Sequence, residues 1–389
     1  MANPSVHKGH RQRLKARFLE TGLDSFTDVQ ALELLLFYAI PQKDTNPIAH
    51  ALLDLMVQPG FYVENFIIVR LNPAAEGLLL QPGMDIRTLI ESGLEEYLTF
   101  QEGCLYLRLR LHQKGIGASV TKQNGVDTFL LDTQECDSAL QALSLAAREL
   151  RDPLASIIVS TSTLQGEDAQ LALLNRGIHQ LLRIIGNMSD AGRIPSDARQ
   201  ETTEMNALFE EIFEKAAVLA SAAGVTIHFQ GLQQPVWSLA DREQLERAVL
   251  NLISNALKFS PAGGTIEASL TKNGKMLRFS IRDSGPGFAQ NLLGSVYNRY
   301  LRQPCIEEGR YGLGLGMVLV RTAAACHGGA VLIDSSEGGA RVTMTMAIRQ
   351  NDTGILRSPV LRVDYAGEQD HALVELADCL PAELYKKET

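Results

Sequence analysis

Residues 246–260, ERAVLNLISNALKFS, constrain this chain more than any other stretch, because two asparagines stand four residues apart within a helical pattern. Asn251 and Asn255 therefore share one face of a helix. Their amide oxygens are hard, neutral ligands of the kind that Mg²⁺ accepts together with substrate phosphates. Lys258, one turn further along, adds a point charge suited to a phosphate. This helix predicts a site for a phosphorylated ligand and Mg²⁺.

A second element of the predicted site follows the strand-like stretch MLRFSIRD, which ends at Asp283. A carboxylate there can accept a hydrogen bond from an exocyclic amine such as that of adenine. Gly285 and Gly287, in DSGPG, let the backbone turn sharply against the base.

A third element, GLGLG at 312–316, opens the helical run GMVLVRTAAA. Free N–H groups at a Gly-rich helix N-terminus can cradle a phosphate, although the same pentapeptide alone can be a helix-packing turn. The order and spacing of the three elements together predict a pocket for ATP and Mg²⁺. The glycines concerned are Gly312, Gly314 and Gly316.

The segment 203–348 resembles the ATP-binding domain of sensor histidine kinases, within the GHKL group (gyrase, Hsp90, kinase, MutL). The asparagine helix matches the N-box, DSGPG matches G1, and GLGLG matches G2. YNRYLR at 297–302 is similar to a drifted F-box that retains Arg299 and Arg302. The resemblance implies a two-layer α/β sandwich with a lid over about 288–311. ATPase branches of the group carry a catalytic Glu where this chain has Asn251, so the kinase branch is favoured.

Leucine-rich seams with 3-4 spacing run through residues 135–190, with QGED at 165–168 as a short connection. This pattern predicts a helical hairpin, and two hairpins would complete a four-helix bundle. A lone coiled-coil spacer is the alternative. The position before the ATP domain resembles the dimerisation bundle of histidine kinases. The seam residues are Leu140, Leu143, Ala147, Leu150, Leu154, Ile157, Thr161 and Leu164, then Leu171, Leu174, Ile178, Leu181, Ile185 and Met188.

ARELRDPLASI at 147–157 resembles the H-box of these kinases, but Arg148 replaces the phosphoacceptor His and Asp152 replaces the following Thr or Asn. A guanidinium stays protonated and is not a nucleophile. Glu149 matches the general base of the family and would be vestigial here. Autophosphorylation at the H-box is therefore not expected. His179, beside the second seam, is interpreted as structural rather than as a substitute acceptor.

Two modules precede the hairpin. Residues 61–133 resemble a small PAS-like α/β sensor domain, with Asn72, Pro73, Ala74 and Glu76 matching, and CLYLRLRLHQ at 104–113 alternates as a half-buried strand does. Residues 1–55 read as helical and resemble the N-terminal segment of RadC-type proteins. No RadC catalytic signature follows. The first twenty residues are predicted to form a helix with a basic face, but acidic residues elsewhere in 1–55 offset that positive charge, so nucleic-acid binding is not expected.

Composition limits which other classes of protein this chain can belong to. The chain has 389 residues, a net charge of −9 and five Cys without metal-ligand spacing; Cys326-His327 is interpreted as a helix end. No signal peptide or membrane-spanning run is visible, so a reduced cytoplasmic location and no membrane partner are expected.

These observations predict a multidomain α+β fold: a helical N-terminal module, a PAS-like domain, a dimeric helical-hairpin bundle, a GHKL sandwich and a C-terminal appendage at 349–389. The expected function is phosphoryl transfer from ATP in two-component-type signalling, as a homodimer with a response regulator or another signalling protein as partner. Two alternatives remain: an ATP-switched scaffold without catalysis, and a GHKL kinase acting on a Ser of a partner.

Overall fold

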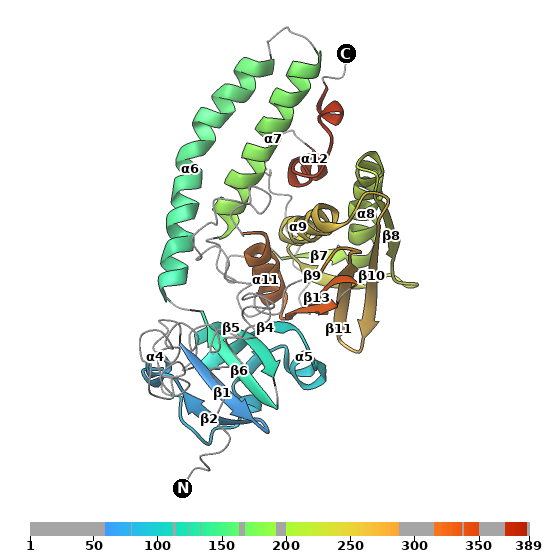
Figure 1. Cartoon of the computed structure of the whole chain (residues 1–389). Coiled ribbons are helices and arrows are strands. Elements are labelled where there is room, and N and C mark those ends of the chain that lie inside the picture. The colour runs from blue at the N-terminus through green and yellow to red at the C-terminus, as the bar shows by residue number, and fades with distance from the viewer. Residues whose placement is uncertain are drawn as a thin grey trace, which may run out of the picture. The chain divides into compact units, whose positions relative to one another are not determined.

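The computed structural model describes residues 59–78, 80–111, 114–123, 125–132, 134–162, 168–191, 200–287, 315–336, 338–349 and 370–386 (Figure 1). The predicted module 1–55 lies outside these residues. The described residues divide into two compact units, one of residues 59–86 with 125–131 and one of residues 87–123 with 132–386. This division cuts through the predicted sensor segment 61–133, because residues 87–123 group with the remainder of the chain.

The smaller unit is an antiparallel sheet in the order β2-β1-β6 with one short helix. Its core includes Phe61 stacked on Phe129, with ring centroids 4.8 Å apart. Asn72 caps the short helix by accepting from the Ala75 N–H, and its Oδ1 also accepts from Gly60 N at 3.0 Å. The elements are β1 (Gly60–Glu64), β2 (Ile67–Leu71), α4 (Pro73–Glu76) and β6 (Val126–Leu131); the 3-10 turn η1 (Ile86–Thr88) falls at the boundary between the units.

The larger unit contains a mixed sheet in the order β5-β4-β12-β13-β11-β10-β8, in which only β8 and β10 pair in parallel; β3 adds to β4. Its strands are β3 (Ile90–Ser92), β4 (Cys104–Leu111), β5 (Lys114–Gln123), β8 (Thr226–Gln230), β10 (Thr265–Asn273), β11 (Met276–Arg282), β12 (Val331–Ser336) and β13 (Gly339–Ala347). A separate two-stranded sheet pairs β7 (Glu201–Glu204) with β9 (Trp237–Ala240).

Three helices cover one face of the sheet formed by β8, β10, β11, β13 and β12. This arrangement gives the two layers expected of segment 203–348 (Figure 1). The layers meet in an aromatic cluster, where Phe213 stacks on Phe229 at 4.4 Å and packs against Phe279 at 5.8 Å. Alternate residues of β11 face these helices, as its apolar period of two requires. The helices are α8 (Met205–Ala222), α9 (Arg242–Phe259) and α11 (Gly316–Cys326).

Strand β4 departs from the half-buried strand that its alternation predicts. Val331 and Ile333 of β12 pair with Tyr106 and Cys104, which join the core under the helices. The intervening leucines, Leu105, Leu107 and Leu109, are also fully buried. The strand is covered on both faces because it continues the sheet of the ATP-domain-like segment. Its short period-two pattern could not reveal this second covering.

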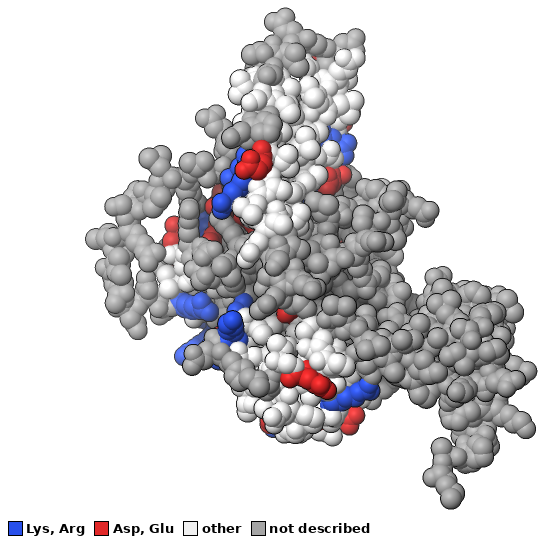
Figure 2. All heavy atoms as spheres, turned by 90° about the vertical axis from the view of Figure 1, so that its left-hand side faces the viewer, with Lys and Arg blue, Asp and Glu red and all other residues white. Residues whose placement is uncertain are grey.

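The hairpin predicted over 135–190 is present as α6 (Gln134–Ser162) and α7 (Asp168–Ala191). One line of the predicted seams is buried between the two arms: Leu140, Ala147 and Leu154 on α6, and Ile178 and Ile185 on α7. The side chains of a second seam line remain exposed to solvent, with exposed fractions of 39–47%: Leu150, Ile157, Leu174 and Leu181. The hairpin surface in the upper part of Figure 2 is correspondingly mostly uncharged.

The C-terminal appendage forms a short helix and a 3-10 turn, α12 (His371–Glu375) and η4 (Ala382–Tyr385). Helix α12 contacts α7, α8 and α9, and η4 contacts α7. Tyr385 is buried against His179, with ring centroids 4.9 Å apart. The appendage is therefore packed against both the hairpin and the helix that carries the two asparagines. Residues 350–369 of the predicted appendage lie outside the described residues.

His327 connects the end of α11 to the start of α9. It is 2% exposed, its Nε2 accepts from Asp241 N at 3.0 Å, and its Nδ1 lies 2.7 Å from the Ala323 carbonyl oxygen. Because Nε2 is an acceptor, the proton of the neutral ring is on Nδ1. Burial lowers the pKa of His327 below its ordinary value of 6.5. The predicted helix end at Cys326-His327 is confirmed.

Acid should therefore destabilise the chain through His327. Above about pH 6.5 neither state protonates this ring, whereas below it the unfolded chain binds a proton that the folded chain excludes. Stability should fall by up to about 1.4 kcal/mol per pH unit as the pH drops from that point. Urea unfolding at about pH 7.5 and about pH 5.5 measures this difference. His327→Gln should reduce it and the exposed His228→Gln should not; an equal loss in both variants would contradict the assignment.

Candidate functional site

The site is built on α9, whose first turn is fixed by Asp241. This side chain caps the helix by accepting from Gln244 N at 3.1 Å. Apolar residues such as Leu245, Ala248 and Leu252 bury the helix against the sheet. Asn251 lies on the same helix and is 1% exposed, whereas Asn255 and Lys258 are half-buried. The helix thus presents the three predicted polar side chains at different depths.

Asn251 has an amide oxygen without a hydrogen-bond partner among the described residues. Its Nδ2 donates to the Arg247 carbonyl oxygen at 3.0 Å and to Glu375 Oε2 at 3.2 Å. Its Oδ1 is buried and accepts nothing there. A Cβ on Gly316, the first residue of α11, would stand 3.0 Å from this oxygen. Since a buried polar atom is normally satisfied, this oxygen is a candidate position for contact with a ligand at the start of α11.

Asp283 follows β11, as the sequence predicts, and one of its oxygens is held by the backbone. Oδ1 accepts from Gly285 N at 2.8 Å and from Ala340 N at 3.2 Å, while Oδ2 accepts no hydrogen bond from the described residues. Two N–H donors fix the carboxylate and leave one oxygen for a donor from a ligand.

Two glycines near Asp283 are required by close backbone approaches. A Cβ on Gly285 would lie 2.6 Å from the Phe259 carbonyl oxygen, at the end of α9. Gly339 has a φ of 128°, and a Cβ there would collide with the Asp283 carbonyl oxygen. Gly287 has a φ of 75°, consistent with its predicted turn. Gly339 was missed, because a glycine in a GG pair before a strand carries no signal of what it touches.

The structure thus brings parts of the other two predicted elements to α9. Gly316 stands beside Asn251, and the loop of Asp283 and Gly285 rests on the end of α9. The remaining predicted residues and the lid at 288–311 lie outside the described residues: Arg299, Arg302, Gly312 and Gly314.

The predicted H-box lies on α6, where Arg148, Glu149 and Leu150 are exposed. His179 of α7 is fixed by its Nδ1, 2.8 Å from the Asn175 carbonyl oxygen, and by the ring of Tyr385. These contacts agree with the structural interpretation of His179.

A buried charged cluster beside Asn251 was not predicted. Arg247 is 2% exposed and contacts Glu375 of α12, with Nε 3.0 Å from Oε1, as well as Asp190 of α7. Glu375 is fully buried and lies 3.5 Å from Arg183 Nε. The sequence contains one indication of this cluster: Arg247 precedes Asn251 by four residues and therefore shares its helix face. Nothing in the sequence pairs Glu375 with it across more than a hundred residues.

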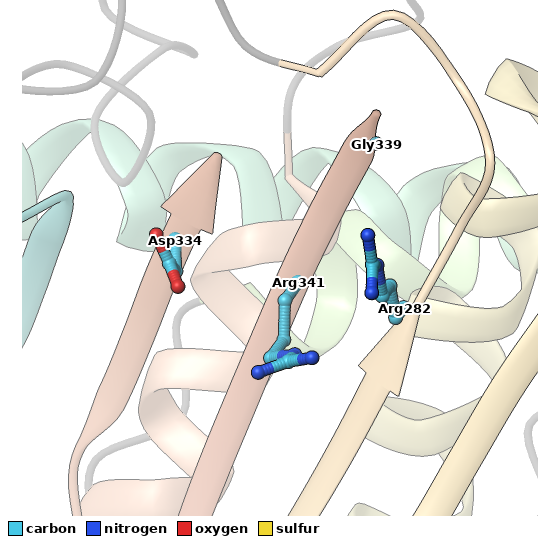
Figure 3. Close-up of a pocket in the computed structure, with 4 residues that line it drawn as sticks. All are labelled: Arg282, Asp334, Gly339 and Arg341. Carbon is cyan, nitrogen blue, oxygen red and sulfur yellow. The ribbon is translucent and has the colours of Figure 1, made fainter. Parts of the chain in front are cut away.

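A hollow of about 230 Å³ lies elsewhere on the sheet, lined by Arg282, Asp334, Gly339 and Arg341 (Figure 3). Arg341 is in register with Arg282 on one side and with Asp334 on the other. These lining residues come from β11, β12 and β13 rather than from α9, and one of them, Gly339, also lies against Asp283.

Metal-binding clusters and membrane-spanning helices are both absent from the described part of the chain. No group of three or more His, Cys, Asp or Glu side chains is placed to hold a metal ion there. No described helix has the length and apolarity needed to cross a membrane.

Comparison with known proteins identifies the class of this segment. Residues 240–350 match the family described as histidine kinase-, DNA gyrase B-, and HSP90-like ATPase. The chain is 28% identical over 248 residues to hybrid signal transduction histidine kinase D of Dictyostelium discoideum, covering 59% of this chain and 16% of that protein. It is 30% identical over 207 residues to sensor protein QseC of Salmonella typhi, covering 50% of this chain and 44% of that protein.

Among solved structures, that of full-length ShkA in complex with AMPPNP aligns with a TM-score of 0.45 and 21% identity, over 55% of this chain and 47% of that one. The chain spans less than half the length of the two curated relatives above. Residues 240–350 therefore carry a domain of the kind that this ATPase family describes, as the sequence motifs suggested.

Proposed function

We propose that this chain is an ATP-binding signalling protein of the sensor histidine kinase type, in which segment 203–348 binds ATP with Mg²⁺. The observation that carries the proposal is the convergence on α9 of Gly316 and of the loop containing Asp283 and Gly285. These segments are distant in sequence, yet each meets α9 through a glycine. Two oxygens accept no hydrogen bond from the described residues and are available to a ligand: Asn251 Oδ1 and Asp283 Oδ2.

The donor set fits the proposed ligands. Asp283 Oδ2 would accept from the exocyclic amine of adenine, and the N-terminus of α11 would face phosphate. Asn251 and Asn255 would offer amide oxygens to Mg²⁺, which prefers such ligands. Lys258 would add positive charge near the phosphates. Bound Mg-ATP would supply a transferable phosphoryl group. The proposal also includes Arg299, Arg302, Gly312 and Gly314, with 288–311 as lid.

The H-box determines which kind of kinase-like protein this is. Arg148 stands exposed on α6 where the resemblance puts the acceptor His, next to Glu149. The exposure makes position 148 accessible but leaves it without a nucleophile. This favours, as second candidates, a scaffold that ATP switches without catalysis or a kinase acting on a Ser of a partner protein.

We also propose a location, an oligomeric state, a partner and roles for the N-terminal modules. The chain would act in the cytoplasm, as a homodimer, with a response regulator or another signalling protein as partner. The PAS-like segment would serve as sensor. The RadC-like residues 1–55 would not bind nucleic acid tightly.

ATP binding should depend on Asp283. Asp283→Asn keeps an oxygen for the backbone N–H groups but turns an NH₂ toward adenine, so affinity should fall by about 10- to 100-fold, the cost of one or two lost hydrogen bonds. Titration calorimetry on the full chain measures this. Asp334→Asn, an exposed Asp on β12, is the matched control. Absence of ATP binding by the folded wild type would refute the proposed function.

Phosphohistidine should be absent from α6 of the wild type and appear in Arg148→His, because Glu149 already stands beside position 148 as a base. Labelling with γ-labelled ATP and Mg²⁺, followed by phosphopeptide mapping, tests this. Asp152→Thr should raise the yield further by removing a negative charge one turn away. Arg151→His, also exposed on α6, is the control and should stay unlabelled. Strong wild-type labelling at His179 would overturn the assignment.

The homodimer should depend on the exposed seam line. Ile178, an obvious candidate from sequence, is buried within the hairpin, so changing it would damage the protomer itself. Ile157→Glu with Leu181→Glu should give folded monomers, since both side chains are nearly half exposed and face outward. Light scattering measures the mass. Val218→Glu, an exposed apolar position on α8, should remain dimeric; a monomeric wild type at micromolar concentration would disprove dimerisation.

A further inference from the structure

Glu375 is a fully buried carboxylate supplied by the C-terminal appendage, outside the segment that matches the ATPase family. Burying an unpaired carboxylate is costly, so such a group is retained only with partners. Arg247 Nε lies 3.0 Å from Oε1, Arg183 Nε lies 3.5 Å from Oε2, and Asn251 Nδ2 lies 3.2 Å from Oε2. The carboxylate therefore contacts one of the two asparagines of the site directly.

This contact determines which way the Asn251 amide faces. An ionised carboxylate only accepts hydrogen bonds, and so does the Arg247 carbonyl oxygen. Both take their donor from Asn251 Nδ2. The reversed amide would put Oδ1 against two acceptors, so Oδ1 is turned to the opposite side, beside Gly316.

The carboxylate is in turn held by charges from two helices. Arg247 pairs with Glu375 and also reaches α7, where its guanidinium contacts Asp190 and Asn187 Oδ1, the latter at 2.9 Å. Arg183, also of α7, completes the set. Arg247 and Arg183 place positive charge beside Glu375, and the hairpin is thereby in contact with the residue that orients Asn251.

We propose that Glu375 is a positioning residue that orients the Asn251 amide oxygen toward the Mg²⁺ and phosphates of the bound nucleotide. The proposal rests on the proposed ATP–Mg²⁺ function. Groups that orient a metal ligand typically contribute about 10- to 100-fold to metal affinity. The signature of this role is the extra affinity for ATP that Mg²⁺ provides, whereas a merely structural residue would alter affinity with and without Mg²⁺ alike.

The test is calorimetric titration of the full chain with ATP, in Mg²⁺ and in EDTA. The wild type should bind more tightly with Mg²⁺. Glu375→Gln has nearly the same shape but can donate its own NH₂ to Asn251, so that only the Arg247 carbonyl still opposes the reversed amide. Its Mg²⁺-dependent gain should fall by about 10- to 100-fold with little change in EDTA. Glu383→Gln, an exposed position in the same appendage, should behave as wild type.

If Glu375→Gln does not fold, as judged by circular dichroism, Glu375→Asp takes its place, because it keeps charge and acceptors and shortens the reach by one methylene. Its Mg²⁺-dependent gain should be intermediate. A full gain in the folded variants would refute the positioning role while leaving ATP binding intact. Tighter binding than wild type would also refute it, because the appendage would then restrain the site. A wild type that binds no ATP in either buffer would refute the proposed function itself.

Discussion

Burial of the Arg247 guanidinium is the interaction on which the larger unit most depends. The side chain is 2% exposed and contacts partners on α7 and α12 from within α9. A charge taken out of water must find its counter-charges nearby, so Asp190 and Glu375 have to be present at the same time. The hairpin, the asparagine helix and the appendage are therefore coupled by one group. Removing either acid would leave a buried cation partly uncompensated, at a cost of about 3–5 kcal/mol.

A second coupling joins α11 to the segment before the hairpin. Arg321 is 4% exposed and donates to both oxygens of Asp132, at 3.0 and 3.1 Å, and its guanidinium lies 5.0 Å from the ring of Tyr106. Tyr106 donates to the same carboxylate at 2.7 Å. Because α11 begins at Gly316, beside Asn251, the start of that helix and its middle are fixed by different parts of the chain. Both contacts come from one guanidinium nitrogen, Nη1, and hydrogen bonds between charged groups of this kind are stronger than neutral ones.

Local patterns predicted the parts of this structure that local physics determines. The spacing of Asn251, Asn255 and Lys258 predicted their common helix, and the seams predicted α6 and α7. Asp283 lies after its strand as expected. What could not be predicted was long-range: that Glu375 returns to Asn251, that Gly339 lies against Asp283, and that β4 is covered twice. Each depends on a partner far away in sequence, and no periodicity encodes such a partner.

The pairing of β4 with β12 has a consequence for how the chain could be divided. Strand β12 bonds to β13 on one side and to β4, through Cys104, Leu105 and Tyr106, on the other. Cutting the chain between the hairpin and residue 203 would strip β12 of that neighbour and leave unpaired N–H and C=O groups along its apolar half, 331–333. Open edges of this kind recruit other chains. The strand from the preceding module thus acts as a covalently supplied edge protector, which a fragment chosen by motif boundaries alone would lack.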